Sequence, residues 1–140
     1  LLPNDLPDLP IVMMNGDLLT KVNIGYLLDF HAQNGGIATM CVREYDLQIP
    51  YGVVKIDKQQ ATKIIEKPVQ KFFVNAGVYV LEPQLISKVG GDQYLDMPNL
   101  LEDQIGLGEK VNVFPIHEYW LDIGQIEEYQ SANNEIKNLL

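Results

Sequence analysis

Two short apolar segments with a helical pattern between them indicate the fold class. Residues 11–14 (IVMM) and 37–42 (IATMCV) are continuously apolar, which predicts strands buried on both faces of a sheet. Between them, apolar residues recur at helical spacing from Ile24 to His31, and Gly35 ends the pattern. A strand, a helix and a strand joined by short links are typical of an α/β protein.

The second half of the chain adds further strands and a hairpin. Residues 51–57 and 61–67 flank a polar KQQ turn and predict a β-hairpin, and residues 72–81 predict a long strand interrupted by Asn75-Ala76-Gly77. We also expect a strand over 110–116 and helices over 83–89, 97–105 and 126–140. The whole pattern predicts one α/β domain over residues 1–140, with a Rossmann-like mixed, mostly parallel sheet flanked by helices.

The composition limits the possible partners. The net charge is −9, which argues against nucleic acid or an anionic membrane as a partner. Small phosphorylated ligands remain possible, because a divalent cation held by carboxylates reverses the local charge. No apolar run approaches the length of a membrane span, and no signal peptide is visible. The single cysteine, Cys41, lies in an apolar run and predicts a buried structural thiol in reducing surroundings.

Two aspartates follow short apolar segments and stand beside glycines. Asp17 comes after residues 11–14, and Asp122 follows Trp120-Leu121. Ligands of α/β sheets collect at the carboxyl ends of strands, so the two carboxylates could meet there and hold Mg²⁺ with substrate phosphates and water. The alternative is that each aspartate caps a helix or a turn, which is the commoner role at a strand end.

Further polar residues and glycines are candidates for contacts with a ligand. Lys67 could meet a phosphate, and Glu66 could accept hydrogen bonds from sugar hydroxyls. Asn75 and Gly77 could bind a polar ligand edge, and Gly52 could mark a close approach to a ring. The alternatives are a solvated hairpin end for the first pair, a bulge for the second and a turn for Gly52.

Five motifs in order carry a resemblance to a known family. They are NGD at 15–17, YGVV at 51–54, EKP at 66–68, NAGVYV at 75–80 and WLDIG at 120–124. Together they resemble the nucleotidyltransferases that make nucleotide sugars from a nucleoside triphosphate and a sugar 1-phosphate. The last motif, followed by EEYQSAN, is most similar to the mannose-1-phosphate guanylyltransferase-like branch.

The resemblance implies a set of site residues and a cofactor. Asp17 and Asp122 would hold Mg²⁺, and Lys67 would hold the sugar phosphate; these are the implied catalytic residues. The residues implied to bind substrate are Gly16, Gly52, Glu66, Asn75 and Gly77. The implied partners are a nucleoside triphosphate, with guanine favoured, and a sugar 1-phosphate, and the acidic surface is compatible with a homo-oligomer. With no signal peptide visible, and with the nucleotide substrates that the resemblance implies, we expect a cytoplasmic protein.

The sequence also departs from the family pattern. The glycine-rich GGxGTRL segment and the proline-lysine pair that support the triphosphate are absent, and LLPNDLPDLP resembles the stretch that follows them. We therefore expect the sugar-phosphate and metal half of an incomplete domain, with an exposed sheet edge and no activity of its own.

Two other classes of protein remain open on these residues. A glycosyltransferase of related fold would carry an Asp-x-Asp motif, and Asn15 in place of the first aspartate counts against it. A nucleotidyltransferase-like regulatory or binding module without activity would also lack the glycine-rich loop.

Overall fold

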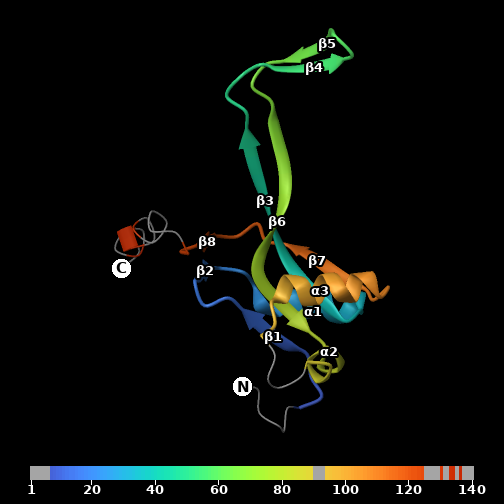
Figure 1. Cartoon of the computed structure of the whole chain (residues 1–140). Coiled ribbons are helices and arrows are strands. Elements are labelled where there is room, and N and C mark those ends of the chain that lie inside the picture. The colour runs from blue at the N-terminus through green and yellow to red at the C-terminus, as the bar shows by residue number, and fades with distance from the viewer. Residues whose placement is uncertain (1–6, 90–93, 125–129, 131–132, 135, 137–140) are drawn as a thin grey trace.

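The predicted order of strand, helix and strand is present in the computed structural model (Figure 1). Strand β1 (Ile11–Met14) leads towards helix α1 (Ile24–Asn34), and strand β3 (Ala38–Gln48) follows the helix. Helix α1 starts where the Asn23 side chain accepts a hydrogen bond from the backbone N–H of Tyr26 at 3.0 Å, which satisfies one of the free donors of the first turn.

The structure describes residues 7–89 and 94–124, together with residues 130, 133, 134 and 136. The helix predicted over 126–140 lies largely outside the described residues. Among the helices of the described part, none is long and apolar enough to cross a membrane.

The central sheet has four strands in the order β1-β6-β3-β7. Strand β6 (Val69–Leu81) is antiparallel to both β1 and β3, whereas β7 (Val111–Pro115) is parallel to β3. Three of the four strands therefore point the same way, as expected for a mixed, mostly parallel sheet. The two apolar strands of the sequence pattern are separated by β6, because residues 76–81 of β6 are buried throughout and need a central position.

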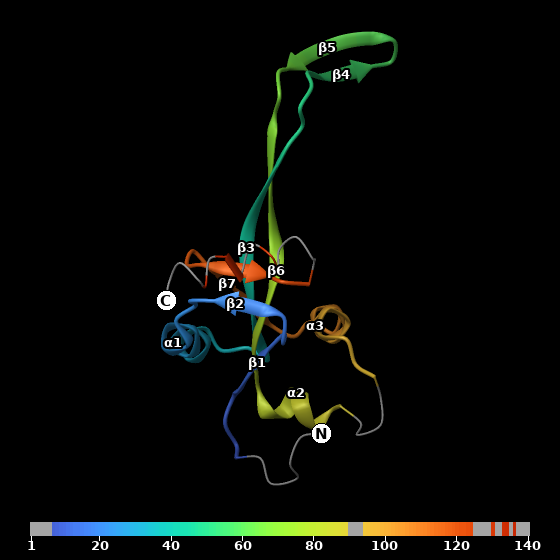
Figure 2. The ribbon, with the colours of Figure 1, turned by 90° about the vertical axis from the view of Figure 1, so that its left-hand side faces the viewer.

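Helices cover both faces of this sheet. Helix α1 lies on one side and α3 (Met97–Gly106) on the other, and the short α2 (Pro83–Ser87) follows the end of β6 (Figure 2). Alternation along β6 sends Val78 and Val80 to the cluster beside α1 and Tyr79 to the cluster beside α3. The sequence prediction of a sheet flanked by helices is confirmed.

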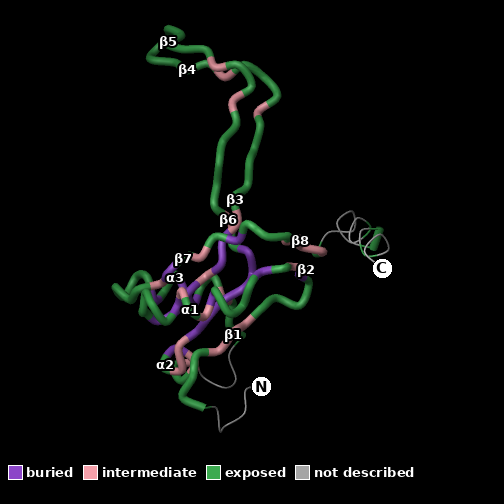
Figure 3. Tube along the Cα trace, turned by 180° about the vertical axis from the view of Figure 1, so that it is seen from behind, coloured by how far each residue is buried: buried purple, intermediate pink, exposed green. Residues whose placement is uncertain are grey.

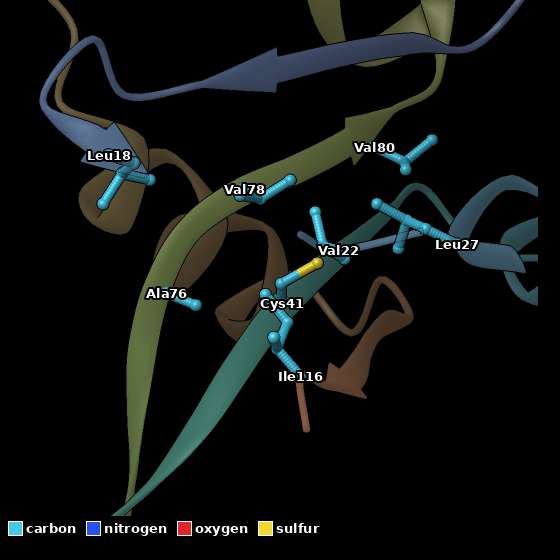
Figure 4. Packing of buried hydrophobic residues seen from close by; sticks show 8 residues of the cluster. All are labelled: Leu18, Val22, Leu27, Cys41, Ala76, Val78, Val80 and Ile116. Carbon is cyan, nitrogen blue, oxygen red and sulfur yellow. The ribbon is translucent and has the colours of Figure 1, made fainter. Parts of the chain in front are cut away.

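Cys41 lies in the cluster beside α1 and is completely buried, as predicted for a structural thiol (Figure 4). Burial, with a smaller contribution from the negative charge of Glu118, raises the pKa of the Cys41 thiol to about 12. The thiol is therefore protonated at neutral pH and is a poor nucleophile.

Strands β3 and β6 continue beyond the sheet as a long two-stranded ribbon (Figure 1). Their pairing in this part runs from Arg43↔Val74 to Gln48↔Val69. At its far end, β4 (Val53–Asp57) and β5 (Gln60–Ile65) form the predicted hairpin. We call residues 43–74 the arm and the other described residues the body.

No residue of the arm is buried, and most of them are exposed (Figure 3). The sequence predicts strands that end at Val42 and begin at Phe72, but the ladder continues through the exposed residues between them. Backbone hydrogen bonds extend the ladder through these residues, although neither face of the ladder is buried there. Because no face is buried, the sequence shows no hydrophobic pattern that would predict a strand.

A second small sheet lies beside the first. The loop predicted over residues 15–20 contains β2 (Leu18–Thr20), which pairs antiparallel with β8 (Trp120–Asp122). Each strand has only three residues and its partner is far away in the sequence, so no local pattern predicts the pair.

Candidate metal and substrate site

The ladder between β2 and β8 brings Asp17 and Asp122 to the same place. Asp17 directly precedes β2, and Asp122 is the last residue of β8, opposite Leu18. The backbone N–H of Ile123 donates to the backbone oxygen of Asp17 at 2.9 Å, which ties the two segments together beyond the ladder. The pairing of the two carboxylates thus depends on backbone contacts.

The two carboxylates converge at Gly124. A Cβ placed on Gly124 would lie 3.0 Å from Oδ1 of Asp122 and 3.2 Å from Oδ2 of Asp17. Both carboxylate oxygens therefore face one small space beside Gly124. That space is open because Gly124 has no side chain. The backbone N–H of Gly124 also donates to Oδ1 of Asp122 at 2.9 Å, which fixes that carboxylate.

This arrangement suits a divalent cation that also binds a substrate. No cluster of three or more His, Cys, Asp or Glu side chains able to hold a metal occurs among the residues that the structure describes. Mg²⁺ commonly uses one or two carboxylates and completes its shell with phosphate oxygens and water. Asp17 is exposed and Asp122 is half-buried, so a phosphate and water can reach both side chains.

Contacts of Trp120 hold β8 against the central sheet. The Trp120 Nε1–H donates to the backbone oxygen of Ala76 at 2.7 Å, and the guanidinium of Arg43 lies 5.6 Å from the centre of its ring. Arg43 also donates to the backbone oxygen of Glu118 at 3.2 Å. Asp122, two residues after Trp120, is therefore attached to β6 through a partly buried hydrogen bond and to β2 through the ladder.

A second group of predicted residues lies next to the aspartates. Asn75 and Gly77 are neighbours on β6, where the Asn75 side chain accepts from the Gly77 N–H and donates to the Tyr79 hydroxyl, each at 2.8 Å. Burial raises the pKa of the Tyr79 hydroxyl, which keeps its proton. The Asn75 amide has further hydrogen-bonding capacity at both ends for a ligand.

Gly77 allows β6 to come close to the turn after β1. Its φ is +71°, and a Cβ there would lie 2.7 Å from Nδ2 of Asn15 and 2.9 Å from Cδ1 of Leu18. The backbone N–H of Asn15 donates to the backbone oxygen of Gly77 at 2.9 Å. Gly77 therefore positions the NGD turn and, through it, Asp17. Gly16 is exposed within that turn, and a Cβ on it would meet nothing within 4 Å.

A pocket of about 320 Å³ opens at this point. Its polar groups come from the NGD turn, from β6 and from the start of α3, where Asp96 precedes the helix. The residues that line it are Asn15, Asn75, Gly77, Tyr79, Leu95, Asp96, Met97 and Pro98. Amide, hydroxyl and carboxylate groups together with a short apolar wall can bind a small polyhydroxylated molecule.

The third group of predicted residues lies on the arm. Gly52 and Glu66 are adjacent, since a Cβ on Gly52 would lie 3.2 Å from Oε2 of Glu66. Lys67 follows in the connection between β5 and β6, with a positive φ of 42°. Both charged side chains are exposed, so they are free to meet a ligand.

The arm separates this third group from the other two. Strand β6 is extended between Val69 and Asn75, and at about 3.3 Å per residue this stretch measures on the order of 20 Å. The structure therefore brings together Asp17 with Asp122, Asn75 with Gly77, and Gly52 with Glu66. It does not bring the arm residues to the aspartates (Figure 1).

Several residues of the site are not marked by the sequence analysis. Asn15 belongs to the pocket through the NGD turn, Tyr79 through β6 and Asp96 through the start of α3. A local signal exists for Gly124, because a glycine two residues after an aspartate can donate a hydrogen bond from its backbone N–H to the aspartate carboxylate. For Asp96 we see no such signal, because its place depends on how α3 packs.

Comparison with known proteins identifies the family of the chain. The sequence profile described as Nucleotidyl transferase matches residues 2–138. Mannose-1-phosphate guanyltransferases of Pichia angusta and Debaryomyces hansenii are each 31% identical to this chain and cover 88% and 89% of it. The chain spans about a third of the length of these relatives, 35% and 36% respectively.

Solved structures support the fold. HddC from Yersinia pseudotuberculosis, complexed with GMP-PN, aligns over 91% of this chain and 55% of its own with a TM-score of 0.61 and 22% identity. The mixed sheet with flanking helices is therefore the fold of the nucleotide-diphospho-sugar transferases.

The structural likeness shows the fold of the chain, and the sequence profile shows its family. The profile match covers nearly the whole chain, and the chain belongs to the nucleotidyl transferase family.

Proposed function

We propose that this chain supplies the metal-binding and sugar-binding residues of an enzyme that joins a nucleoside triphosphate to a sugar 1-phosphate. A phosphate oxygen of the sugar 1-phosphate attacks the α-phosphorus of the triphosphate, and the bond to the β-phosphate breaks. The products are a nucleoside-diphosphate sugar and pyrophosphate. The observation that carries the proposal is the convergence of the Asp17 and Asp122 carboxylates at Gly124.

The main obstacle to this reaction is repulsion between the two anions. The attacking oxygen is already charged, so the reaction needs no strong general base. Two unit charges 4 Å apart repel by about 4 kcal/mol at an effective dielectric constant of 20. Mg²⁺ bound to the two aspartates would supply charge neutralisation. Asp17 and Asp122 would hold that ion, and their backbone contacts would fix where the phosphates meet.

The pocket beside the aspartates would bind the sugar. Asn75 would offer its remaining donor and acceptor to sugar hydroxyls, and Gly77 would keep the pocket open beside Asn15. We assign a further sugar contact to Gly52 and Glu66 and a phosphate contact to Lys67 on the basis of the family motifs. The arm is extended in this structure and holds these three residues away from the aspartates. They would act at the site only when the far end of an arm is brought against a body.

We propose GTP as the nucleotide, because the curated relatives are named mannose-1-phosphate guanyltransferases. The sugar is a hexose 1-phosphate on the same ground. A cytoplasmic location accords with a nucleoside triphosphate substrate. The glycine-rich triphosphate loop of the family is absent from these 140 residues, and we propose that the chain alone is inactive and acts within a longer protein.

The test is pyrophosphate release by the full-length protein that contains these residues. It is assayed with Mg²⁺ across a grid of four nucleoside triphosphates and several sugar 1-phosphates. Release that depends on one pair, with GTP and a hexose 1-phosphate expected, supports the proposal. A folded full-length protein that releases pyrophosphate with no pair contradicts it and favours a binding or regulatory role.

A matched pair of variants assigns the activity to the site. Asp122→Asn keeps the size and most contacts of the side chain but weakens its hold on Mg²⁺, and we expect turnover to fall at least about 100-fold. Asp29→Asn makes the same change on the exposed surface of α1 and should leave turnover unchanged. Equal turnover in both variants would remove Asp122 from the site.

A further inference from the structure

The ladder between β2 and β8 is too short to hold Asp17 and Asp122 together by itself. Each strand has three residues, and the two strands form a separate two-stranded sheet. A two-stranded sheet with no further layer is marginally stable in water. The placement of the two carboxylates therefore depends on the contacts that attach β2 and β8 to the central sheet.

A bulge in β6 supplies two of these contacts. Where the register between β3 and β6 shifts, one residue of β3 lies opposite three residues of β6, residues 76–78. The backbone oxygen of Ala76 accepts from the Trp120 Nε1–H at 2.7 Å, and that of Gly77 accepts from the Asn15 N–H at 2.9 Å. Neighbouring carbonyl groups of one bulge thus attach both segments that carry the aspartates.

Arg43 supplies a third contact. This half-buried residue of β3 places its guanidinium 5.6 Å from the centre of the Trp120 ring and donates to the backbone oxygen of Glu118 at 3.2 Å. A guanidinium can make both contacts at once, because it is planar and has several N–H donors at its edge. Arg43 forms no ion pair with a carboxylate in the part of the chain that the structure describes. Its contacts are therefore with the segment that leads into β8.

We propose that Arg43 is a positioning residue for the metal site. It holds the face of the Trp120 ring while Ala76 holds the ring N–H, so β8 keeps one orientation and Asp122 stays beside Asp17. Arg43 acts through Trp120 and touches neither metal nor substrate. The inference rests on the proposed function, because it assigns Arg43 to the aspartate pair that would bind Mg²⁺.

A positioning role and a simple charge effect change cation binding in opposite directions. Arg43 carries a positive charge in contact with Trp120, two residues before Asp122. Through charge alone, its removal would favour a cation at the carboxylates. Removal of a positioning contact would instead weaken the site, since contacts that orient metal ligands typically change affinity by about tenfold or more. Arg43→Gln therefore separates the two roles by the direction of the change.

The first measurement needs no metal. NMR follows hydrogen exchange at the Ile123 amide, which donates to the backbone oxygen of Asp17, and at the indole N–H of Trp120, the only tryptophan of the chain. In Arg43→Gln both should exchange at least about threefold faster, while the amide of Val80 in the central sheet is unchanged. Equal exchange of Ile123 in variant and wild type, or an equal rise at Val80, overturns the inference.

The second measurement adds Mn²⁺ and follows the broadening of the amide signals of residues 121–124. We expect the apparent dissociation constant to rise at least about threefold in Arg43→Gln. The matched control, Lys71→Gln, removes the same charge from an exposed residue of the arm and should leave the constant unchanged or lower it. A constant in Arg43→Gln that equals or falls below that of the wild type overturns the inference.

The two measurements separate this inference from the proposed function. A wild-type chain in which Mn²⁺ does not broaden the signals of residues 121–124 contradicts the proposed metal site. Hydrogen exchange at Ile123 then still decides whether Arg43 holds β8 in place. Normal Mn²⁺ binding by the wild type together with no weakening in Arg43→Gln overturns only the role of Arg43.

Discussion

Strands β3 and β6 pass through both the body and the arm, and the two halves of the same ladder differ in what surrounds them. In the body, Met40↔Tyr79 lies under α3 with Tyr79 only 1% exposed. In the arm, Tyr45↔Phe72 has the same pairing but no covering layer. Backbone pairing alone is therefore enough to shape the strands, whereas burial, and with it most of the stability, comes from the helices on either face of the body.

The largest expected effect is a difference in stability between matched leucines. Leu27 of α1 is fully buried, and Leu27→Ala should lower the free energy of unfolding by about 2–5 kcal/mol. Leu47→Ala, in the exposed arm, should change it by about 0.5 kcal/mol or less. Urea unfolding at low protein concentration measures both. Similar losses would show that the arm is as tightly packed as the body.

Glycines give the next comparison. Gly77→Ala places a Cβ at positive φ and 2.7 Å from Asn15, so we expect a loss of at least about 2 kcal/mol. In the arm, the Cβ of Gly52→Ala would lie 3.2 Å from the end of the flexible Glu66 side chain and in ordinary contact with Ile64, so the loss should be about 0.5 kcal/mol or less. Thermal unfolding of the two variants tests this. If the order of the two losses is reversed, Gly77 is not the point of close approach.

The pH dependence of stability should report on the body through Cys41. Its pKa is about 12 in the folded chain and near 9 in the unfolded chain, so the unfolded state loses the proton first as pH rises. Above pH 9 this group lowers the free energy of unfolding by about 1.4 kcal/mol per pH unit. Cys41→Ala lacks this contribution, and the difference between the two proteins across that range measures it. Parallel pH profiles would contradict a buried thiol.

The smallest effect concerns the ion pair of the arm. Lys71 and Glu44 are 2.7 Å apart, and this contact holds the pKa of Glu44 below and that of Lys71 above its ordinary value. Because both are exposed, Lys71→Gln should leave the unfolding temperature nearly unchanged while the pKa of Glu44 returns towards its usual value. An NMR titration of the Glu44 carboxyl measures the shift. A pKa that does not move would show that the two side chains are apart in solution.

The sequence predicts the body better than the arm for a physical reason. The apolar runs at the start of β3 and the end of β6 identify buried strands, and these are confirmed. Strand β1 forms where its apolar run predicts a strand, but the prediction of burial on both faces is wrong, because β1 lies at an end of the four-stranded sheet and its residues are half-buried or exposed. The continuation of β3 beyond Val42 has no buried face, so its pattern carries no signal. The hairpin is predictable from its turn. Its position at the end of an extended ribbon is not predictable, because the ribbon depends on pairing between β3 and β6, which are distant in the sequence.

The same distinction applies to the candidate site. Asp17 and Asp122 are identifiable as carboxylates one and two residues from a glycine, and they lie together in the structure. Their meeting depends on the three-residue ladder of β2 and β8, which has no local signal. The roles of Gly52, Glu66 and Lys67 stay predictions, since the arm holds them away from the body.

The most direct test of the account asks whether a divalent cation binds at Asp17 and Asp122. Mn²⁺ is added in small amounts to the ¹⁵N-labelled chain, and the broadening of backbone amide NMR signals is mapped. The account predicts broadening first at residues 16–18 and 121–124, little in the arm, and loss of this pattern in the Asp17→Asn/Asp122→Asn double variant. Broadening that is spread over the acidic surface, or that is unchanged in the double variant, would contradict a metal site formed by these two carboxylates.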